Sequence, residues 1–482
     1  MFFNSIDFAI FLPVVFVLYW FVFRKPNSRN VLLLVSSYFF YGWWDWRFLF
    51  LLSFSTMLDY YSGIRIYHAE TKHSRKLWLW ASILINLGFL GFFKYYNFFI
   101  DSLIDVGLNV APSTLQFILP VGISFYTFHG LSYVIDIYYD RIRPEYNPVT
   151  YALFVSFFPL LVAGPIERAT HLLPQLKQDR QFDYAQSVNG LRQILWGLFK
   201  KMVIADNCAT YANMIFNNPD TYSGGTLLIG ATFFAIQIYG DFSGYSDIAL
   251  GTARLFGVEL LRNFAFPYFS RDIGEFWRRW HISLSSWFRD YVYVPLGGSK
   301  GGTWLKIRNV FIIFLLSGFW HGANWTFIIW GGLNALYYLP LLLGNKNRTH
   351  LNVVAEGRLL PSFRELGLML STFGLTVVAW IFFRSDSVSG AVDYTVRMIV
   401  DLFDPTAMTG AYGFVVNNVR PVILLIIVLF FMIEWLGRSS EYAIESLTLR
   451  WKQPTRWAFY YAIIFMVISY SGQKQGFIYF QF

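Results

Sequence analysis

The chain has 482 residues, of which 56% are hydrophobic, 21% are aromatic and only 14% are charged. Soluble domains carry about 25% charged residues, so this composition argues against a water-soluble multidomain enzyme. Membrane proteins concentrate a basic excess such as the net charge of +9 in cytoplasmic loops. We therefore expect no nucleic-acid partner. The single cysteine, Cys208, offers neither an internal disulfide nor a soft-metal site, and no metal is expected.

Long apolar segments predict an all-α polytopic membrane protein in which residues 1–482 form a single domain. A helix needs about 17 to 25 residues to cross the hydrocarbon layer. The clear candidates are 7–23, 77–93, 115–135, 149–166, 221–240, 366–383, 421–437 and 457–473. The shorter stretches 31–44 and 48–64 predict a tight helical hairpin, and 191–216 is interrupted by charges. With partial spans included, we expect about ten or eleven transmembrane helices.

The positions of basic residues predict the sidedness of the chain. Five basic loops fall on one side if the N-terminus is outside, and that side is then the cytoplasm. These loops are 24–29, 65–76, 140–143, 346–364 and 438–456. The stretch 149–223 fits this pattern only if it contains a re-entrant element. The segment 385–419 falls outside and is expected to carry a short amphipathic helix.

Residues 262–308 carry a net charge of +5, more than half of the total. Within EFWRRWHISLSSWFRDY, 275–291, helical spacing predicts one interfacial helix with two neighbouring faces. The cationic face holds Arg278, His281, Ser285 and Arg289, and the apolar face holds Trp277, Trp280, Leu284 and Trp287. An ordinary cytoplasmic loop with a tryptophan belt explains the same pattern about equally well.

Between two basic flanks, residues 309–345 contain no Asp, Glu, Lys or Arg. One span cannot return the chain to the same side, so the pattern predicts a membrane hairpin with its turn at 320–325. His321 is the one side chain in the run whose reference pKa lies near neutrality. Histidine accepts and returns a proton near neutrality, and an ionisable group at membrane depth is a functional hypothesis by default.

Two features of the turn suit acyl transfer. Asn324 is placed to orient the histidine ring or a substrate, and the N-terminus of the second limb suits a developing oxyanion. The alternative is a histidine held by a carbonyl inside a helical bundle.

Three other patterns are weaker. The stretch YGDFSGYSD, 239–247, places Asp241 and Asp247 at the end of a span, where they could pair with arginine or open the helix for a substrate; close helix packing around a buried salt bridge is as good an interpretation. GGSKGGT at 297–303 lacks the spacing of a phosphate-binding loop. His129, Glu167 and His171 are interpreted as structural or loop residues.

The sequence resembles the membrane-bound O-acyltransferase (MBOAT) superfamily, and within it the bacterial alginate O-acetyltransferase subgroup. The likeness covers essentially the whole chain, with a motif core at about 239–345. Its residues are YGDFSGYSDIALG at 239–251, EFWRRWHISLSSWFRDYVYVPLGGS at 275–299 and SGFWHGANWTFIIWG at 317–331. The N-terminal FFNSIDFAIF and C-terminal FIYFQF look similar as well.

This resemblance implies an MBOAT fold with re-entrant and interfacial helices. It also implies His321 and His281 as catalytic residues. Substrate-binding roles are expected for nearby polar and aromatic groups, namely Asn324, Trp320, Arg278, Arg279, Arg289 and Asp241. The resemblance further implies a bacterial cytoplasmic (inner) membrane protein that moves acetyl groups from acetyl-CoA, a substrate and not a resident cofactor, toward O-acetylation of a polysaccharide. The partners implied are membrane lipid, the polysaccharide acceptor and an extracytoplasmic acetyltransferase or acyl-carrier protein.

Two other functions fit parts of the pattern. Broken helices and buried polar residues also serve transporters or flippases of lipid-linked sugars or anions. Other branches of the superfamily acylate a lipid, a protein or a teichoic-acid carrier. Consumption of acetyl-CoA distinguishes an enzyme from a flippase.

Overall fold

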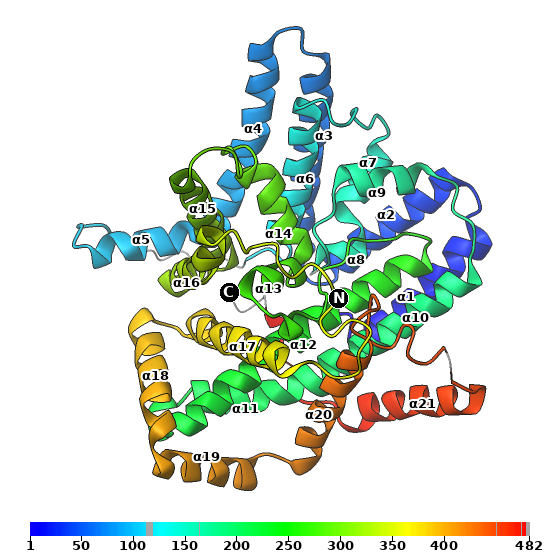
Figure 1. The fold of residues 1–482 in the computed structure, drawn as a ribbon. Coiled ribbons are helices and arrows are strands. Elements are labelled where there is room, and N and C mark those ends of the chain that lie inside the picture. Colours follow the sequence, from blue (N-terminus) through cyan, green and yellow to red (C-terminus); the bar gives the residue numbers. More distant parts are fainter. Residues whose placement is uncertain (112–118, 163, 450, 474, 479–482) are drawn as a thin grey trace. The chain divides into compact units, whose positions relative to one another are not determined.

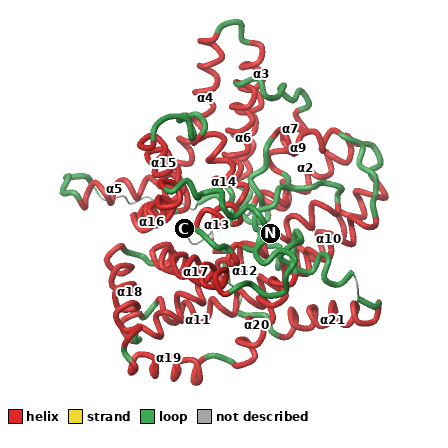
Figure 2. Tube along the Cα trace, viewed as in Figure 1, coloured by secondary structure: helices red, strands yellow, loops and turns green. Residues whose placement is uncertain are grey.

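The computed structural model describes residues 1–111, 119–162, 164–449, 451–473 and 475–478, and every regular element in these ranges is helical (Figure 2). The chain divides into two compact units. The first contains residues 1–191 and 248–261, and the second contains 192–247 and 262–482. The expectation of one domain over 1–482 stays a prediction.

The first unit is built mainly from the N-terminal helices (Figure 1). They are α1 (Ile6–Val17), α2 (Pro26–Gly42), α3 (Phe48–His68), α4 (Lys72–Leu90), α5 (Tyr96–Asp105), α6 (Ile123–Tyr138), α7 (Pro148–Ser156), α8 (Phe158–Leu161) and α9 (Ala169–Lys177). Helix α3 packs against α4 and α6, whereas α2 packs mainly against α7 and α8. The two limbs predicted for 31–44 and 48–64 are the helices α2 and α3, joined by a short turn; they contact each other, but each packs more extensively against other helices.

The second unit contains the site region and the C-terminal helices. Its helices are α11 (Asp206–Phe216), α13 (Ile273–Arg279), α14 (Ile282–Phe288), α15 (Thr303–His321), α16 (Trp325–Leu343), α17 (Phe363–Arg384), α18 (Val388–Val400), α19 (Pro405–Asn418), α20 (Pro421–Leu436) and α21 (Gln453–Ser469). Helices α10 (Tyr184–Leu198) and α12 (Gly224–Leu255) each contribute residues to both units. The amphipathic helix predicted within 385–419 is confirmed as α18, which buries Ala391, Tyr394 and Met398 on one face.

Among the described residues, five helices are long and apolar enough to cross a membrane. They are Lys72–Asp105, Gly224–Leu255, Thr303–His321, Trp325–Leu343 and Phe363–Arg384. A sixth span results if α19 and α20, which meet at 103°, count as one broken span. The number is below the ten or eleven expected, since several predicted spans form shorter helices. The expected span 149–166, for example, forms the shorter apolar helix Pro148–Leu161, and the expected span 115–135 begins at residues outside the described ranges.

The hairpin predicted for 309–345 is confirmed by α15 and α16, which pack along each other and are joined by Gly322, Ala323 and Asn324. Two glycines allow this close contact. A Cβ atom on Gly318 would lie 2.2 Å from the carbonyl oxygen of Phe327, and one on Gly331 would lie 2.3 Å from that of Phe314. Small residues at such crossings let the backbones of membrane helices approach each other.

We predict that Gly318→Ala lowers the free energy of unfolding, by about 1 to 3 kcal/mol, because its methyl group overlaps a backbone carbonyl that cannot move alone. Gly332→Ala is the matched control, since its nearest neighbour would be Leu315 Cδ2 at 3.8 Å. Thermal unfolding of the two variants in the same nanodiscs measures the difference. Equal melting temperatures would contradict the close contact.

Candidate active site

His321 is the last residue of α15 and its side chain is enclosed by aromatic rings. The residue is 3% exposed. Its ring centroid lies 5.0 Å from that of Trp330 on α16 and 5.3 Å from that of Phe383 on α17. The adjacent Trp320 is 4.8 Å away. Three helices therefore hold the imidazole in an apolar enclosure, where electrostatic interactions with a reacting group are strong.

His281 does not lie on one continuous helix, so the helical face predicted for 275–291 is wrong. The chain breaks between α13 and α14, and His281 adopts a left-handed conformation with φ of 43°. Asn263 holds this break. Its carbonyl oxygen accepts the Ile282 N–H at 2.9 Å, and its side-chain oxygen accepts the Ser283 hydroxyl at 2.6 Å. These bonds turn the His281 side chain away from the cationic face on which it was predicted.

The break directs His281 into the interior, where it is 1% exposed. Its ring packs edge-on against Phe242 at 4.6 Å and lies 6.1 Å from Trp320. Burial lowers the pKa of His281 to about 3, which keeps this imidazole neutral near pH 7. The structure thus brings three predicted residues together, because the Trp320 ring contacts both histidines.

Asn324 stabilises the turn of the hairpin. Its side-chain oxygen caps α16 by accepting the Thr326 N–H at 3.0 Å, and its amide donates to the carbonyl of Asp386 at 2.9 Å. The cap occupies one N–H of the helix terminus that was expected to face a developing oxyanion. The predicted roles of Asn324 in orienting the ring or a substrate stay predictions.

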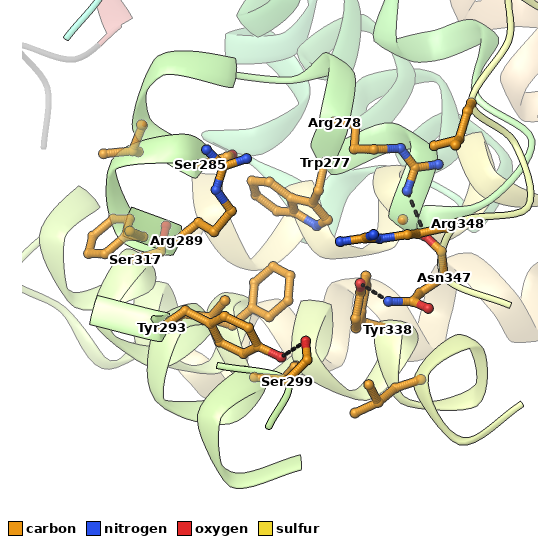
Figure 3. Close-up of a pocket in the computed structure, with 18 residues that line it drawn as sticks. Trp277, Arg278, Ser285, Arg289, Tyr293, Ser299, Ser317, Tyr338, Asn347 and Arg348 are labelled. Atoms are coloured by element: carbon orange, nitrogen blue, oxygen red, sulfur yellow. Dashed lines mark hydrogen bonds between the residues drawn. The ribbon is translucent and has the colours of Figure 1, made fainter. Parts of the chain in front are cut away.

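A cavity of about 480 Å³ lies beside the hairpin (Figure 3). Its wall includes Trp277, Phe314 and Tyr338, and its polar lining includes Arg278, Arg289 and Arg348. Ser317 also lines the cavity, and it lies one helical turn before His321 on α15. The cavity therefore combines an apolar wall with cationic groups, and neither His321 nor His281 is among the residues that line it.

The predicted arginines differ in how their charge is used. Arg278 donates to the carbonyls of Asn347 and His350 at 2.7 and 2.8 Å, and so fixes the loop after α16. Arg279 does not line the cavity; it pairs with the buried Glu275 at 2.8 Å. Both side chains support the local fold.

Arg289 is more accessible to a ligand in the cavity than Arg278 or Arg279, because its side chain is 64% exposed. It pairs with the adjacent Asp290. That carboxylate raises the pKa of the Arg289 guanidinium. Arg348, an exposed residue of the loop after α16, also lines the cavity. The sequence interpretation missed Arg348, although it lies in a basic loop assigned to the cytoplasm.

Asp241 lies within the continuous helix α12 and belongs to a buried ion cluster outside the cavity. One carboxylate oxygen is 2.9 Å from the ammonium of Lys201, which also contacts Asp206 at 2.8 Å. Lys200 pairs with Asp247 at 2.6 Å. Helix packing around a buried salt bridge, one of the two interpretations given above, matches this arrangement, and the partner is lysine. A substrate role for Asp241 stays a prediction.

His129, Glu167 and His171 form a structural network in the first unit, as interpreted from the sequence. The Glu167 carboxylate contacts His171 Nδ1 at 2.8 Å, and the Glu167 N–H donates to His129 Nε2 at 3.1 Å. The carboxylate raises the pKa of His171. Within the described ranges, no group of three or more His, Cys, Asp or Glu side chains is arranged to hold a metal ion.

Residues 138–347 match the family model of MBOAT, the membrane-bound O-acyltransferase family. The protein named "Probable alginate O-acetylase AlgI" of Pseudomonas aeruginosa is 39% identical over 80% of this chain and 72% of its own length. The chain belongs to the membrane-bound O-acyltransferase family. The peptidoglycan O-acetyltransferase of Helicobacter pylori is 32% identical over 98% of the chain and 95% of its own length. The teichoic acid D-alanyltransferase of Bacillus subtilis is 32% identical over 46% of the chain and 58% of its own length.

Membership of this family makes the protein a multi-pass membrane enzyme that transfers acyl groups. The matched region 138–347 includes both histidines, the hairpin turn and most of the cavity lining. The catalytic roles of His321 and His281 remain predictions from the motif and from the geometry above.

We predict that His281→Asn retains more stability than His281→Val. Asparagine tolerates the left-handed backbone of this residue, whereas a β-branched side chain there lowers the free energy of unfolding by about 1 to 2 kcal/mol. Both variants remove the imidazole, so thermal unfolding of the purified proteins in one detergent compares the backbone effect. A valine variant that melts at or above the asparagine variant would show that residue 281 is not held in this conformation.

Proposed function

We propose that this protein is a membrane O-acetyltransferase that uses acetyl-CoA from the cytoplasm and directs the acetyl group to O-acetylation of an extracytoplasmic polysaccharide. The observation that carries the proposal is a buried histidine at the apex of an uncharged hairpin, one helical turn from a cavity with cationic side chains. Relatives named as acetylating alginate and peptidoglycan support acetyl as the acyl group and a polysaccharide as the final acceptor.

The cavity supports a thioester donor with a phosphorylated carrier. Arg289 and Arg348 present cationic groups suited to phosphate oxygens, and Trp277 and Phe314 offer apolar surface to the arm that carries the thioester. The line of cavity residues reaches Ser317, so the acetyl end would enter toward His321.

In the proposed reaction His321 acts as a general base. The imidazole takes the proton of the acceptor hydroxyl as its oxygen attacks the thioester carbonyl. This attack forms the new carbon–oxygen bond and a tetrahedral intermediate. Collapse of the intermediate re-forms the carbonyl, breaks the carbon–sulfur bond and releases the thiolate, which receives the proton from the imidazolium. His281, held neutral beside Trp320, would complete the site.

We place the protein in the bacterial cytoplasmic membrane with its N-terminus outside. The basic loops then face the cytoplasm, where the donor is made, and α18 lies on the opposite side. The acceptor hydroxyl belongs to the polysaccharide itself or to an extracytoplasmic acetyltransferase or acyl-carrier partner that passes the acetyl group on.

We predict that His321→Ala lowers the rate of acetyl transfer by about 10² to 10⁴, the usual contribution of a positioned general base. Release of free CoA and formation of acetylated product are measured with radiolabelled acetyl-CoA and membranes that supply the acceptor. His73→Ala is the control, because His73 is an exposed histidine outside the site and its loss should not change the rate. Equal turnover by wild type and His321→Ala would remove His321 from the chemistry.

We also predict that Arg289→Gln and Arg348→Gln each raise the KM for acetyl-CoA by about tenfold, as expected for loss of one charge-assisted hydrogen bond. The same variants should leave turnover of S-acetyl-N-acetylcysteamine unchanged, since that thioester lacks the phosphates. The control is Arg364→Gln, an exposed arginine outside the cavity lining. Equal effects on both thioesters would contradict phosphate binding by these arginines.

A further inference from the structure

The segment that follows α21, residues 470–478, runs back into the second unit; we call its described residues the C-terminal segment. The N–H of Gly472 donates to the carbonyl of Met202 at 2.9 Å, and the amide of Asn207 donates to the carbonyl of Tyr470 at 2.8 Å. A Cβ atom on Gly472 would lie 2.5 Å from the carbonyl carbon of Asp206. The backbone thus enters in close contact with the start of α11.

Two charged residues of the ion cluster bind the backbone of the C-terminal segment. Lys201, whose side chain is 2% exposed, donates to the carbonyl of Gln475 at 3.3 Å in addition to its contacts with Asp206 and Asp241. The second oxygen of Asp241 accepts the N–H of Ile478 at 2.9 Å. Buried charges are costly unless their hydrogen-bonding capacity is satisfied. The C-terminal segment therefore completes a cluster that α12 and its neighbours leave incomplete.

These bonds flank Phe477, which is 1% exposed. Its ring lies 4.5 Å from that of Tyr245 and 5.9 Å from that of Phe242, both on α12. Phe242 in turn packs edge-on against His281 at 4.6 Å. A row of ring contacts consequently connects Phe477, through Phe242 and His281, to Trp320 beside His321.

We propose that Phe477 is a positioning residue of the histidine site and that the C-terminal segment, held by Lys201 and Asp241, is the element that supports the His281 ring. The effect expected on turnover rests on the proposed function, whereas the effect on the accessibility of His281 does not.

The physical reason is packing. Protein interiors are close-packed, so loss of a phenyl ring leaves a cavity into which neighbouring side chains relax. Phe242 contacts the Phe477 ring on one side and packs edge-on against the His281 ring at 4.6 Å on the other, so a shift of Phe242 changes the packing of His281 directly. Removal of the Phe477 ring therefore loosens His281 while α15 and α16 keep their own contacts.

The first test measures how fast diethyl pyrocarbonate modifies each histidine in the full-length protein, with peptides quantified by mass spectrometry. This reagent modifies neutral imidazoles that it can reach. In Phe477→Ala we expect modification of His281 to rise about tenfold, while His129, equally buried in the first unit, stays protected. Phe465→Ala on α21 is the matched control, because Phe465 is 61% exposed and should leave both histidines unchanged.

The second test measures acetyl transfer by the same variants. For Phe477→Ala we expect kcat to fall about ten- to hundredfold with the KM for acetyl-CoA unchanged, the pattern of a misplaced site residue. Phe477→Leu, which fills much of the cavity, should restore most of the rate. If Phe477 only stabilised the fold, Phe477→Ala would lower the amount of folded enzyme and expose His129 together with His281. Phe477→Leu would then not restore the rate.

The proposal is overturned if His281 stays as protected in Phe477→Ala as in wild type, or if His129 becomes equally reactive. If Phe477→Ala does not fold, modification of His281 and His129 is measured in Phe477→Leu and Phe477→Met instead. The proposal is overturned if His281 is as protected in both variants as in wild type, or if His129 becomes equally reactive. Absence of any acetyl transfer by wild type would reject the proposed function, yet the modification pattern would still decide whether Phe477 positions His281.

Discussion

The contact between the two limbs of the α15–α16 hairpin determines where His321 lies, and with it the place of the proposed chemistry. A backbone carbonyl of each limb faces a glycine of the other, with room for no side chain atom in between. That contact fixes the height of the turn, and His321 is the last residue before it. The aromatic enclosure depends on the same contact, because Trp330 reaches the imidazole from the second limb. A wider hairpin would leave the ring without its opposite wall.

The buried charged side chains described for the second unit mostly form ion pairs with one another. Glu275, which is 1% exposed, accepts hydrogen bonds from both Arg271 and Arg279, and Lys201 bridges two carboxylates. Removal of one partner from a buried pair leaves an uncompensated charge and costs about 3 to 5 kcal/mol. The basic character of the motif core is thus mainly a property of the fold. Arg289 and Arg348, which line the cavity, are the cations to which we assign the proposed substrate contacts.

The hairpin and its histidine could be predicted from the sequence because the signal is local: a long run without Asp, Glu, Lys or Arg between two basic flanks, with one histidine near its middle. The break at His281 could not, because the hydrogen bonds that hold it come from Asn263, which is remote along the chain. Helical spacing alone therefore favoured a continuous helix. Arg348 was missed for a similar reason, since its loop reaches the cavity through contacts with Arg278. Among the described residues, fewer helices than expected reach the length of a span where hydropathy does not register a helix break, as at Phe157 between α7 and α8 within the expected span 149–166.

The indole and phenyl rings around His321 also bear on a competition that every acyl-transfer enzyme faces. An activated thioester carbonyl accepts water as readily as it accepts an alcohol, and water is present at far higher concentration. A general base cannot discriminate between the two nucleophiles, because it would deprotonate either one. Selection must come from access, and an enclosure of Trp320, Trp330 and Phe383 offers water few hydrogen-bonding partners. Enlarging or polarising that enclosure would waste donor through hydrolysis before it slowed the consumption of the thioester.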